Sequence, residues 1–165
     1  MSAAGTIALT AIGSPYIQEF DTLSNTAAST TNALAINGWE LTETGGGARD
    51  NEQYGVDTGG SGTGDTYRYG SADATDRALG GLQSGTLVPI IGASFSNNTG
   101  GTITSLDVAY TGEQWRIGNT LAARDDRIDF QYSLDATSLT TGTWVDVNPL
   151  DFTNLVKTAV TVGAL

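Results

Sequence analysis

The chain has 165 residues, enough for one domain with a hydrophobic core, and it contains 22 glycines but only 3 prolines. Its 7 basic and 18 acidic residues give a formal net charge of -11 and leave no basic stripe for binding nucleic acid or an anionic membrane surface. Because the chain has no cysteine and no histidine, it excludes disulfides, thiolate metal sites, histidine-ligated zinc and serine–histidine catalysis.

Residues 1–15 are predicted to form an N-terminal extension, and residues 16–165 a single β-sandwich domain. The extension holds a short strand candidate at residues 8–12, but it lacks the basic start and long apolar run of a secretory signal. No apolar run reaches the ~18 residues of a membrane-spanning helix, so we expect no membrane insertion. Three explanations of this N-terminus stay open: a cytosolic protein, a chain whose signal has been removed, and export through a C-terminal signal.

Short β-strands are predicted along the rest of the chain, because β-branched residues are frequent and glycine-rich turns separate the apolar stretches. The candidates lie at residues 39–42, 67–69, 87–95, 103–117, 128–134 and 143–147. Strands at such spacing, with turn signals between them, favour an antiparallel sandwich. Residues 44–65 form a long glycine-rich segment, which is either a loop that serves a ligand, an ion or a lid, or a mobile surface loop.

The longest strand candidate, residues 103–117, ends within the sequence YTGEQWRIGN. Strict alternation would switch its apolar face midway, so we predict a β-bulge at Gly112 that turns Trp115 and Ile117 towards the core. The strand candidate that follows carries a predicted buried stripe on alternate residues: Ile128, Phe130, Tyr132 and Leu134.

A hairpin between these two strands would bring four polar side chains together on the open face of the sandwich: Gln114, Arg116, Asp129 and Gln131. Amides and arginine–carboxylate pairs suit the hydroxyl groups of a sugar, so these residues are the predicted ligand-binding patch for a polysaccharide or glycan. The alternative is an exposed cross-strand arginine–carboxylate pair without a ligand, which would contribute well under ~1 kcal/mol to stability.

Four aspartates in or beside glycine-rich loops are the predicted metal ligands: Asp57, Asp65, Asp73 and Asp76. Calcium needs about six to eight oxygen ligands, partly from backbone carbonyls, which a glycine-rich loop exposes well. We therefore expect a structural Ca²⁺ here, although the spacing matches neither an EF-hand nor a nonapeptide calcium repeat. The alternative is that the aspartates cap turns and that Asp76 pairs with Arg77 at the surface.

Catalysis by two carboxylates is the hydrolase chemistry that this composition leaves, and Glu113 with Asp129 is the pair to consider. A glycosidase needs two carboxyl groups ~5 to 10 Å apart in a cleft. The predicted bulge at Gly112 puts these two side chains on opposite faces of the sheet. We therefore expect that the isolated chain is not an enzyme.

Several long motifs follow one another along residues 16–152. They are FDTL (20–23), NGWELTETG (37–45), GDTYRYG (64–70), DRALGGLQSG (76–85), IGASFSNNTGGTITSLDVAYTGEQWRIGN (91–119) and RIDFQYSLDATSLTTGTWVDVNPLDF (127–152). In this order they resemble a jelly-roll-like β-sandwich module of secreted bacterial proteins. Such modules occur beside extracellular nucleases, phosphatases, calcium-binding repeat proteins and surface-anchored proteins, where they are accessory rather than catalytic.

The resemblance implies a non-catalytic module outside the cell or at its surface, working in carbohydrate binding, adhesion, or surface or filament assembly. The alternative is an accessory domain of a secreted hydrolase, either a nuclease or a phosphatase. Many relatives are exported without a cleaved N-terminal signal, which would suit this N-terminus.

The resembled family continues beyond the position of Leu165 with further strands, so we expect the sandwich to lack its last strands and to keep an unpaired edge. Either the chain is a fragment or has a further tail, or a neighbouring subunit donates the missing strand, which would make the protein a homo-oligomer through strand exchange. Residues 8–12 are the predicted donor. The alternative is that this strand pairs within its own chain.

Overall fold

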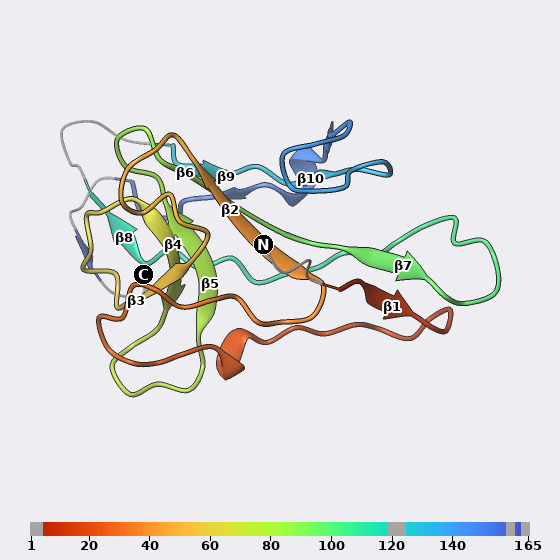
Figure 1. Cartoon of the computed structure of the whole chain (residues 1–165), viewed down its shortest axis with the longest axis horizontal. Helices are drawn as coiled ribbons and strands as arrows, with labels where there is room; N and C mark the ends of the chain where they lie inside the picture. Colours follow the sequence, from red (N-terminus) through yellow and green to blue (C-terminus); the bar gives the residue numbers. More distant parts are fainter. Residues whose placement is uncertain (1–4, 119–124, 158–160, 163–165) are drawn as a thin grey trace.

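The computed structural model describes residues 5–118, 125–157 and 161–162. Within these residues the chain forms thirteen short strands, two 3-10 helices and no α-helix, which confirms an all-β protein. The strands form six small sheets, five of two strands and one of three (Figure 1).

The elements have the following bounds in chain order. They are β1 (Ile7–Leu9), η1 (Phe20–Thr22), β2 (Trp39–Thr44), β3 (Tyr54–Asp57), β4 (Asp65–Tyr69), β5 (Ala78–Leu82), β6 (Val88–Ala93), β7 (Phe95–Asn97), β8 (Arg116–Ile117), β9 (Arg127–Ile128), β10 (Gln131–Tyr132), β11 (Val145–Asp146), η2 (Asn148–Leu150), β12 (Phe152–Thr153) and β13 (Thr161–Val162). The predicted strands at 39–42, 67–69 and 87–95 are confirmed by β2, β4 and the pair β6 and β7.

Two sheets make up the packed part of the molecule. Strands β2 and β6 pair antiparallel, with Trp39 opposite Ala93 and Thr44 opposite Val88. Beside them, β4 lies between β3, to which it is parallel, and β5, to which it is antiparallel. The prediction of purely antiparallel pairing is therefore wrong for this sheet, because the glycine-rich loop 58–64 carries the chain back to start β4 alongside β3.

The hydrophobic core lies between these two sheets and the segment that contains η1. Its buried members come from that segment, β2 and β3, and further apolar side chains pack against them: Leu23, Leu41, Tyr54 and Val56, with Phe20, Leu34, Ile36, Leu79 and Ile91 around them. The alternating pattern of β2 explains why Leu41 faces inward. Burial of these side chains from water is the main favourable contribution to folding.

A buried arginine fastens the η1 segment to this core. Arg68 of β4 is only 1% exposed, and its guanidinium donates hydrogen bonds to the backbone carbonyls of Phe20, Asp21 and Ser24 at 3.2, 2.8 and 3.0 Å. Burial lowers the pKa of Arg68, and the neighbouring charge of Arg77 lowers it further. The carbonyl bonds compensate for the water that this cation has lost.

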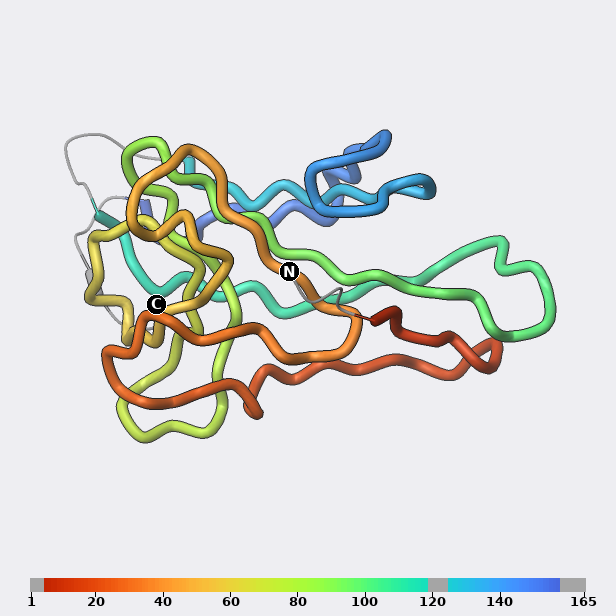
Figure 2. Tube along the Cα trace, in the orientation of Figure 1, coloured from red at the N-terminus to blue at the C-terminus, as the bar shows by residue number. Residues whose placement is uncertain are grey.

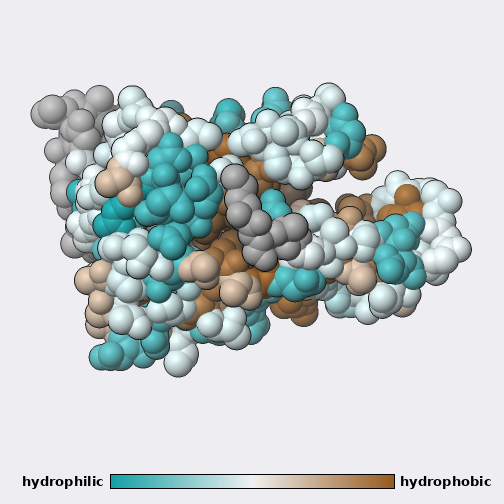
Figure 3. Space-filling view, viewed as in Figure 1, coloured by the Kyte–Doolittle hydropathy of each residue, from teal (hydrophilic) through white to brown (hydrophobic). Residues whose placement is uncertain are grey.

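The rest of the chain is more open. Strands β1 and β7 pair in parallel and, with the loops at 10–15 and 98–102, form an arm that extends to the right in Figures 1 and 2. Strands β10 and β11 form a second projection above it (Figure 1). Figure 3 shows apolar surface in the hollow between the packed part and these two projections.

The predicted long strand at 103–117 is wrong over most of its length. Only Arg116 and Ile117 belong to a strand, β8, which pairs with β13. Gly112 is consequently not a bulge in a ladder. It serves instead for close packing, since an added Cβ at this position would overlap the ring of Phe152.

The predicted hairpin and buried stripe are also wrong. The segment 128–134 splits into β9, which pairs with β12, and β10, which pairs with β11, so neither pairs with β8. Three of its four apolar residues are exposed: Ile128 (57%), Tyr132 (46%) and Leu134 (94%). Alternation of apolar and polar residues indicates which side chains share a face of a strand. Those side chains are buried only where another sheet or segment covers that face.

The N-terminal strand is engaged within its own chain. Ile7 of β1 lies opposite Phe95 of β7 and is only 6% exposed. This is the pairing that the sequence left open as the alternative to donating residues 8–12 to a neighbour. No helix in the described ranges is long and apolar enough to cross a membrane.

Candidate binding site around Trp115

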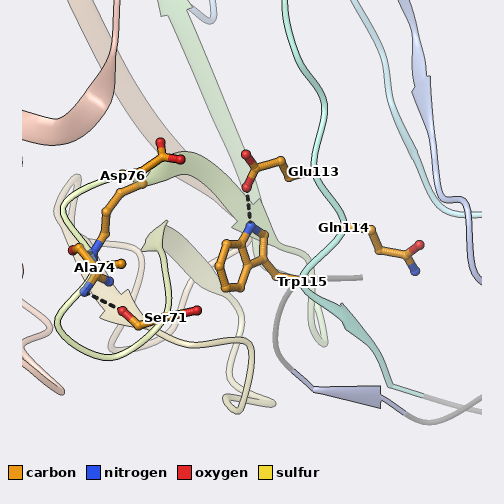
Figure 4. A pocket seen from close by; sticks show the side chains of 7 residues that line it. Ser71, Ala74, Asp76, Glu113, Gln114 and Trp115 are labelled. Atoms are coloured by element: carbon orange, nitrogen blue, oxygen red, sulfur yellow. Dashed lines mark hydrogen bonds between the residues drawn. The ribbon is translucent and has the colours of Figure 1, made fainter.

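Trp115 lies just before β8 and holds two neighbours at once. Its indole stacks on the ring of Tyr69, with the ring centroids 5.9 Å apart and an angle of 12° between the planes. Its Nε1 donates a hydrogen bond of 2.8 Å to the carboxylate of Glu113 (Figure 4). Ile117 is buried as predicted, at 1% exposure, whereas Trp115 is only half-buried. The tryptophan is therefore fixed in orientation and still partly accessible.

The loop that follows β4 faces this tryptophan, and Arg77 shapes it. Arg77 is 6% exposed, and its guanidinium donates to the carbonyls of Ala74 and Ser71, each at 3.1 Å. Gly70 begins the loop, and an added Cβ there would lie within 2.5 Å of the Arg77 side chain. The predicted surface pair of Asp76 with Arg77 is wrong, because the guanidinium turns inward to these carbonyls.

Gln114 holds the other wall in place. Its side-chain oxygen accepts hydrogen bonds from the backbone N–H groups of Leu155 and Val156 at 2.9 and 2.8 Å, and its Nε2 donates to the Val156 carbonyl at 2.9 Å. The residue is 6% exposed, and its side chain points away from Trp115 (Figure 4). Gln114 thus acts like a strand partner for residues 155–156, and it fixes the backbone on either side of itself.

These two walls enclose a pocket of about 340 Å³, lined by Ser71, Ala74, Asp76, Arg77, Glu113, Gln114 and Trp115. Asp76 and Glu113 are exposed. Among the described residues, Asp76 has no hydrogen-bond or ion-pair partner, and Glu113 uses only its Oε2, for the indole. The pocket therefore combines an oriented aromatic ring with carboxylate oxygens that can accept hydrogen bonds.

The four residues of the sequence-predicted patch do not share one surface. Gln114 binds residues 155–156, Arg116 donates to the carbonyl of Gly60 at 2.8 Å, and Gln131 donates to Asp146 at 2.6 Å. Asp129 forms an ion pair with Arg127. Among the described residues, the only contact of this kind between two of the four is a long hydrogen bond of 3.5 Å from Gln114 Nε2 to the backbone carbonyl of Arg116, and no hydrogen bond or ion pair joins this pair to Asp129 or Gln131. The reason is the missing hairpin, since β8 and β10 pair with different strands.

The four predicted metal ligands have separate surroundings. Asp57 caps the next turn, accepting hydrogen bonds from the N–H groups of Gly59 and Ser61 at 2.8 and 3.1 Å. Asp65 is buried against Arg49, Asp73 is exposed with a φ of 61°, and Asp76 lines the Trp115 pocket. The residues that the structure describes contain no group of three or more acidic side chains that could hold a metal ion. The aspartates are thus not gathered into one site, and a calcium ion stays a prediction.

The structure contains a buried pair of carboxyl groups, Asp65 and Glu43, that was not predicted from the sequence. Asp65 is 0% exposed and its Oδ2 accepts a bond of 2.7 Å from Arg49, while Oδ1 has no hydrogen-bond partner in the described structure. Glu43, 3% exposed, lies beside it and accepts from the backbone N–H of Thr66 at 2.9 Å. Burial raises the pKa of Asp65 to about 7, the Glu43 carboxyl raises it as well, and the charge of Arg49 lowers it.

The sequence did contain a signal for half of this pair. Alternation in β2 puts Glu43 on the same face as Leu41, which is the core face. The contribution of Arg49 had no such signal, because it comes from the loop between β2 and β3 and reaches Asp65 only in the folded chain.

Comparison with known proteins adds no relative, since no family model, no curated protein and no solved structure matches the chain.

Proposed function

We propose that this protein is a non-catalytic, carbohydrate-binding β-module and that Trp115 is the centre of its sugar site. The observation that carries the proposal is the pocket in which an oriented indole stands beside the carboxylates of Glu113 and Asp76. We further propose that the packed sheets belong to a jelly-roll-like sandwich that works outside the cell or at its surface, in adhesion or assembly.

The chemistry of a sugar fits such a pocket. A pyranose ring has an apolar face of C–H groups, which packs against an aromatic ring, and hydroxyl groups around its edge, which donate hydrogen bonds. Trp115 supplies the aromatic surface. Its contacts with Tyr69 and Glu113 already fix the indole, so ligand binding costs less side-chain conformational entropy. Exposed carboxylate oxygens supply the acceptors.

The acidic charge favours neutral ligands. The formal net charge of -11 repels sulfated and uronic-acid polysaccharides, and the guanidinium of Arg77, which lines the pocket, is already bonded to carbonyls. We therefore expect neutral glycans to bind better than anionic ones.

The test is a glycan array followed by titration of the best glycan with matched variants. Trp115→Ala should weaken binding at least about tenfold, equivalent to ~1.4 kcal/mol, because it removes the stacking surface. Glu113→Gln should weaken it less, since an amide keeps one acceptor oxygen. Trp144→Ala is the control: Trp144 is also half-buried, and its Nε1 donates to the Thr141 carbonyl.

Two results would reject the proposal. One is that no glycan binds to the intact, folded chain. The other is that Trp115→Ala and Trp144→Ala bind alike, whereas Gln131→Ala abolishes binding. The second result would move the sugar site to the patch that the sequence predicted.

A further inference from the structure

The segment from Ile103 to Thr111 has the composition of a β-strand but no strand partner among the described residues. None of its residues belongs to a strand, and its backbone makes no hydrogen bond with the backbone of another described residue. Figure 2 shows it running back along the long axis of the molecule from the loop near residue 100. Its alternate side chains Leu106, Val108 and Tyr110 are 63%, 45% and 47% exposed.

The unpaired backbone and the exposed apolar side chains together indicate what kind of partner would bind this segment. Unpaired N–H and C=O groups in a β-branched, apolar stretch are a template for another extended strand. A groove of about 330 Å³ beside it, lined in part by Val108, Tyr110, Leu150 and Phe152, offers room for an apolar side chain. The fitting partner is therefore an extended polypeptide with alternating apolar residues.

We propose that this partner is the same segment of a second copy of the chain, paired antiparallel about Val108. In that register Leu106 lies opposite Tyr110 of the second copy, and Asp107 lies opposite Ala109. Apolar side chains then meet on one face, and no two carboxylates are opposed. A shift that centres the pair on Asp107 would oppose two carboxylates, which is unfavourable.

The charge distribution bears on where two copies can meet. Two chains that each carry -11 repel, and they can approach most closely where neither carries charge. No charged residue occurs between Arg77 and Asp107 in the sequence, so Asp107 is the single charge of the segment. Strands of the same chain are already engaged, because β1 pairs with β7 and β13 with β8.

The first experiment measures self-association of the intact chain by light scattering over a concentration series. We expect dimers that strengthen with added salt, since salt screens the repulsion between the two acidic chains. Val108→Asp should raise the dissociation constant at least about tenfold by opposing new charges across the pair. Ala109→Pro tests the backbone bonds separately, because proline has no N–H. Leu155→Asp is the control, adding the same charge at a residue that is 73% exposed elsewhere.

The second experiment reads the register. The chain has no cysteine, so a Val108→Cys variant carries a single thiol. Directly opposed residues of an antiparallel pair have their Cα atoms roughly 4.5–5.5 Å apart, within reach of a disulfide. Mild oxidation should therefore link this variant into covalent dimers several times faster than a Leu155→Cys variant.

Three outcomes would overturn the inference. The intact chain could stay monomeric at millimolar concentration in high salt. It could assemble equally well with Val108→Asp and Leu155→Asp, each checked for folding by circular dichroism, which would place the interface elsewhere. The two cysteine variants could cross-link at the same rate. None of these results depends on whether the protein binds a glycan.

Discussion

Leucine and tyrosine side chains are buried in one region of the molecule and exposed in another. In the packed sheets, Leu41 is 8% exposed and Tyr54 is 2% exposed. Along the open segment, Leu106 is 63% exposed and Tyr110 is 47% exposed, although both stretches alternate apolar and polar residues. The packed strands belong to paired sheets that cover one another, whereas residues 103–111 belong to no sheet in the described part of the chain.

The comparison teaches that alternation specifies a face and that pairing decides its burial. Isolated strands are marginal in water, and they become stable only when a second layer covers the apolar face. The packed half therefore supplies most of the stability. The open half supplies the surfaces from which we infer function, namely the Trp115 pocket and the unpaired segment.

The largest difference in stability should come from replacing a tyrosine with alanine in each region. Tyr54→Ala should lower the free energy of unfolding by roughly 3–5 kcal/mol, because it leaves a cavity in the core. It also removes the hydroxyl that accepts from the backbone N–H of Ser24 at 2.8 Å. Tyr110→Ala should lower it by about 1 kcal/mol or less in dilute protein. Urea denaturation measures both, and equal losses would contradict the division into packed and open regions.

A smaller effect should come from exchanging arginine for lysine in each region. Arg68→Lys should lower the free energy of unfolding by about 2 kcal/mol, because one ammonium cannot replace the fork that binds several carbonyls. Arg127 is 53% exposed and pairs with Asp129 and Asp151. Arg127→Lys should change the free energy by less than about 0.5 kcal/mol. A loss at Arg127 as large as that at Arg68 would show that the surface pair matters as much as the buried fork.

The buried carboxyl of Asp65 should make stability depend on pH. Its pKa in the folded chain, about 7, is above the unfolded value of 3.8, so the folded state binds more protons between these values. Its stabilising contribution is full below about pH 4 and is lost as the pH rises through about 7, on the order of 1–3 kcal/mol. The facing groups are Glu43, Arg49 and Tyr67.

Urea titrations between pH 4.5 and 8 can isolate this contribution. Asp65→Asn cannot titrate, so the difference in free energy between the intact chain and this variant should shrink or reverse as the pH rises. Exposed Asp135, whose pKa is lowered by its hydrogen bonds with Thr143 and Ser133, acts in the opposite direction at lower pH and is common to both proteins. A difference that stays constant with pH would mean that Asp65 is already charged throughout.

The smallest effect should come from calcium. Asp57 and Asp65 are already engaged with backbone N–H groups and with Arg49, so any ion in this region has few free carboxylates. At a concentration equal to its dissociation constant, calcium would add only ~0.4 kcal/mol. Tm with millimolar calcium should then exceed Tm with chelator by about 1–2 °C. Superimposable melts would remove the calcium prediction.

The sequence predicts the fold well where contacts are local or pairing is regular. Strands at 39–42 and 67–69 follow from alternation, and β2 and β4 are found there. The partners of the later strands could not be predicted. Strands β8, β9 and β10 have only two residues each, and each pairs with a strand that is distant in sequence. Period-two patterns carry no information about which strand lies alongside.

The site was partly predictable for the same reason. The stretch around Trp115 stood out by composition, and Glu113 with Trp115 does form a contact. The other wall, from Ser71 to Arg77, could not be anticipated, since it meets Trp115 only through the stacking of that ring on Tyr69. The sequence predicts Gln114 to be a ligand residue, whereas in the structure its side chain binds residues 155–156. These hydrogen bonds join parts of the chain that are distant in sequence, and the sequence contains no sign of such a contact.

Amide hydrogen exchange on dilute, monomeric protein tests the central comparison most directly. We predict that the amides of residues 104–110 exchange close to unprotected rates, because they have no backbone partner among the described residues, whereas those of Thr42 and Ile90, which form a hydrogen-bonded pair across β2 and β6, are protected by several orders of magnitude. Comparable protection of residues 104–110 and of these paired residues would contradict the account, because it would mean that the open segment already has a strand partner within its own chain.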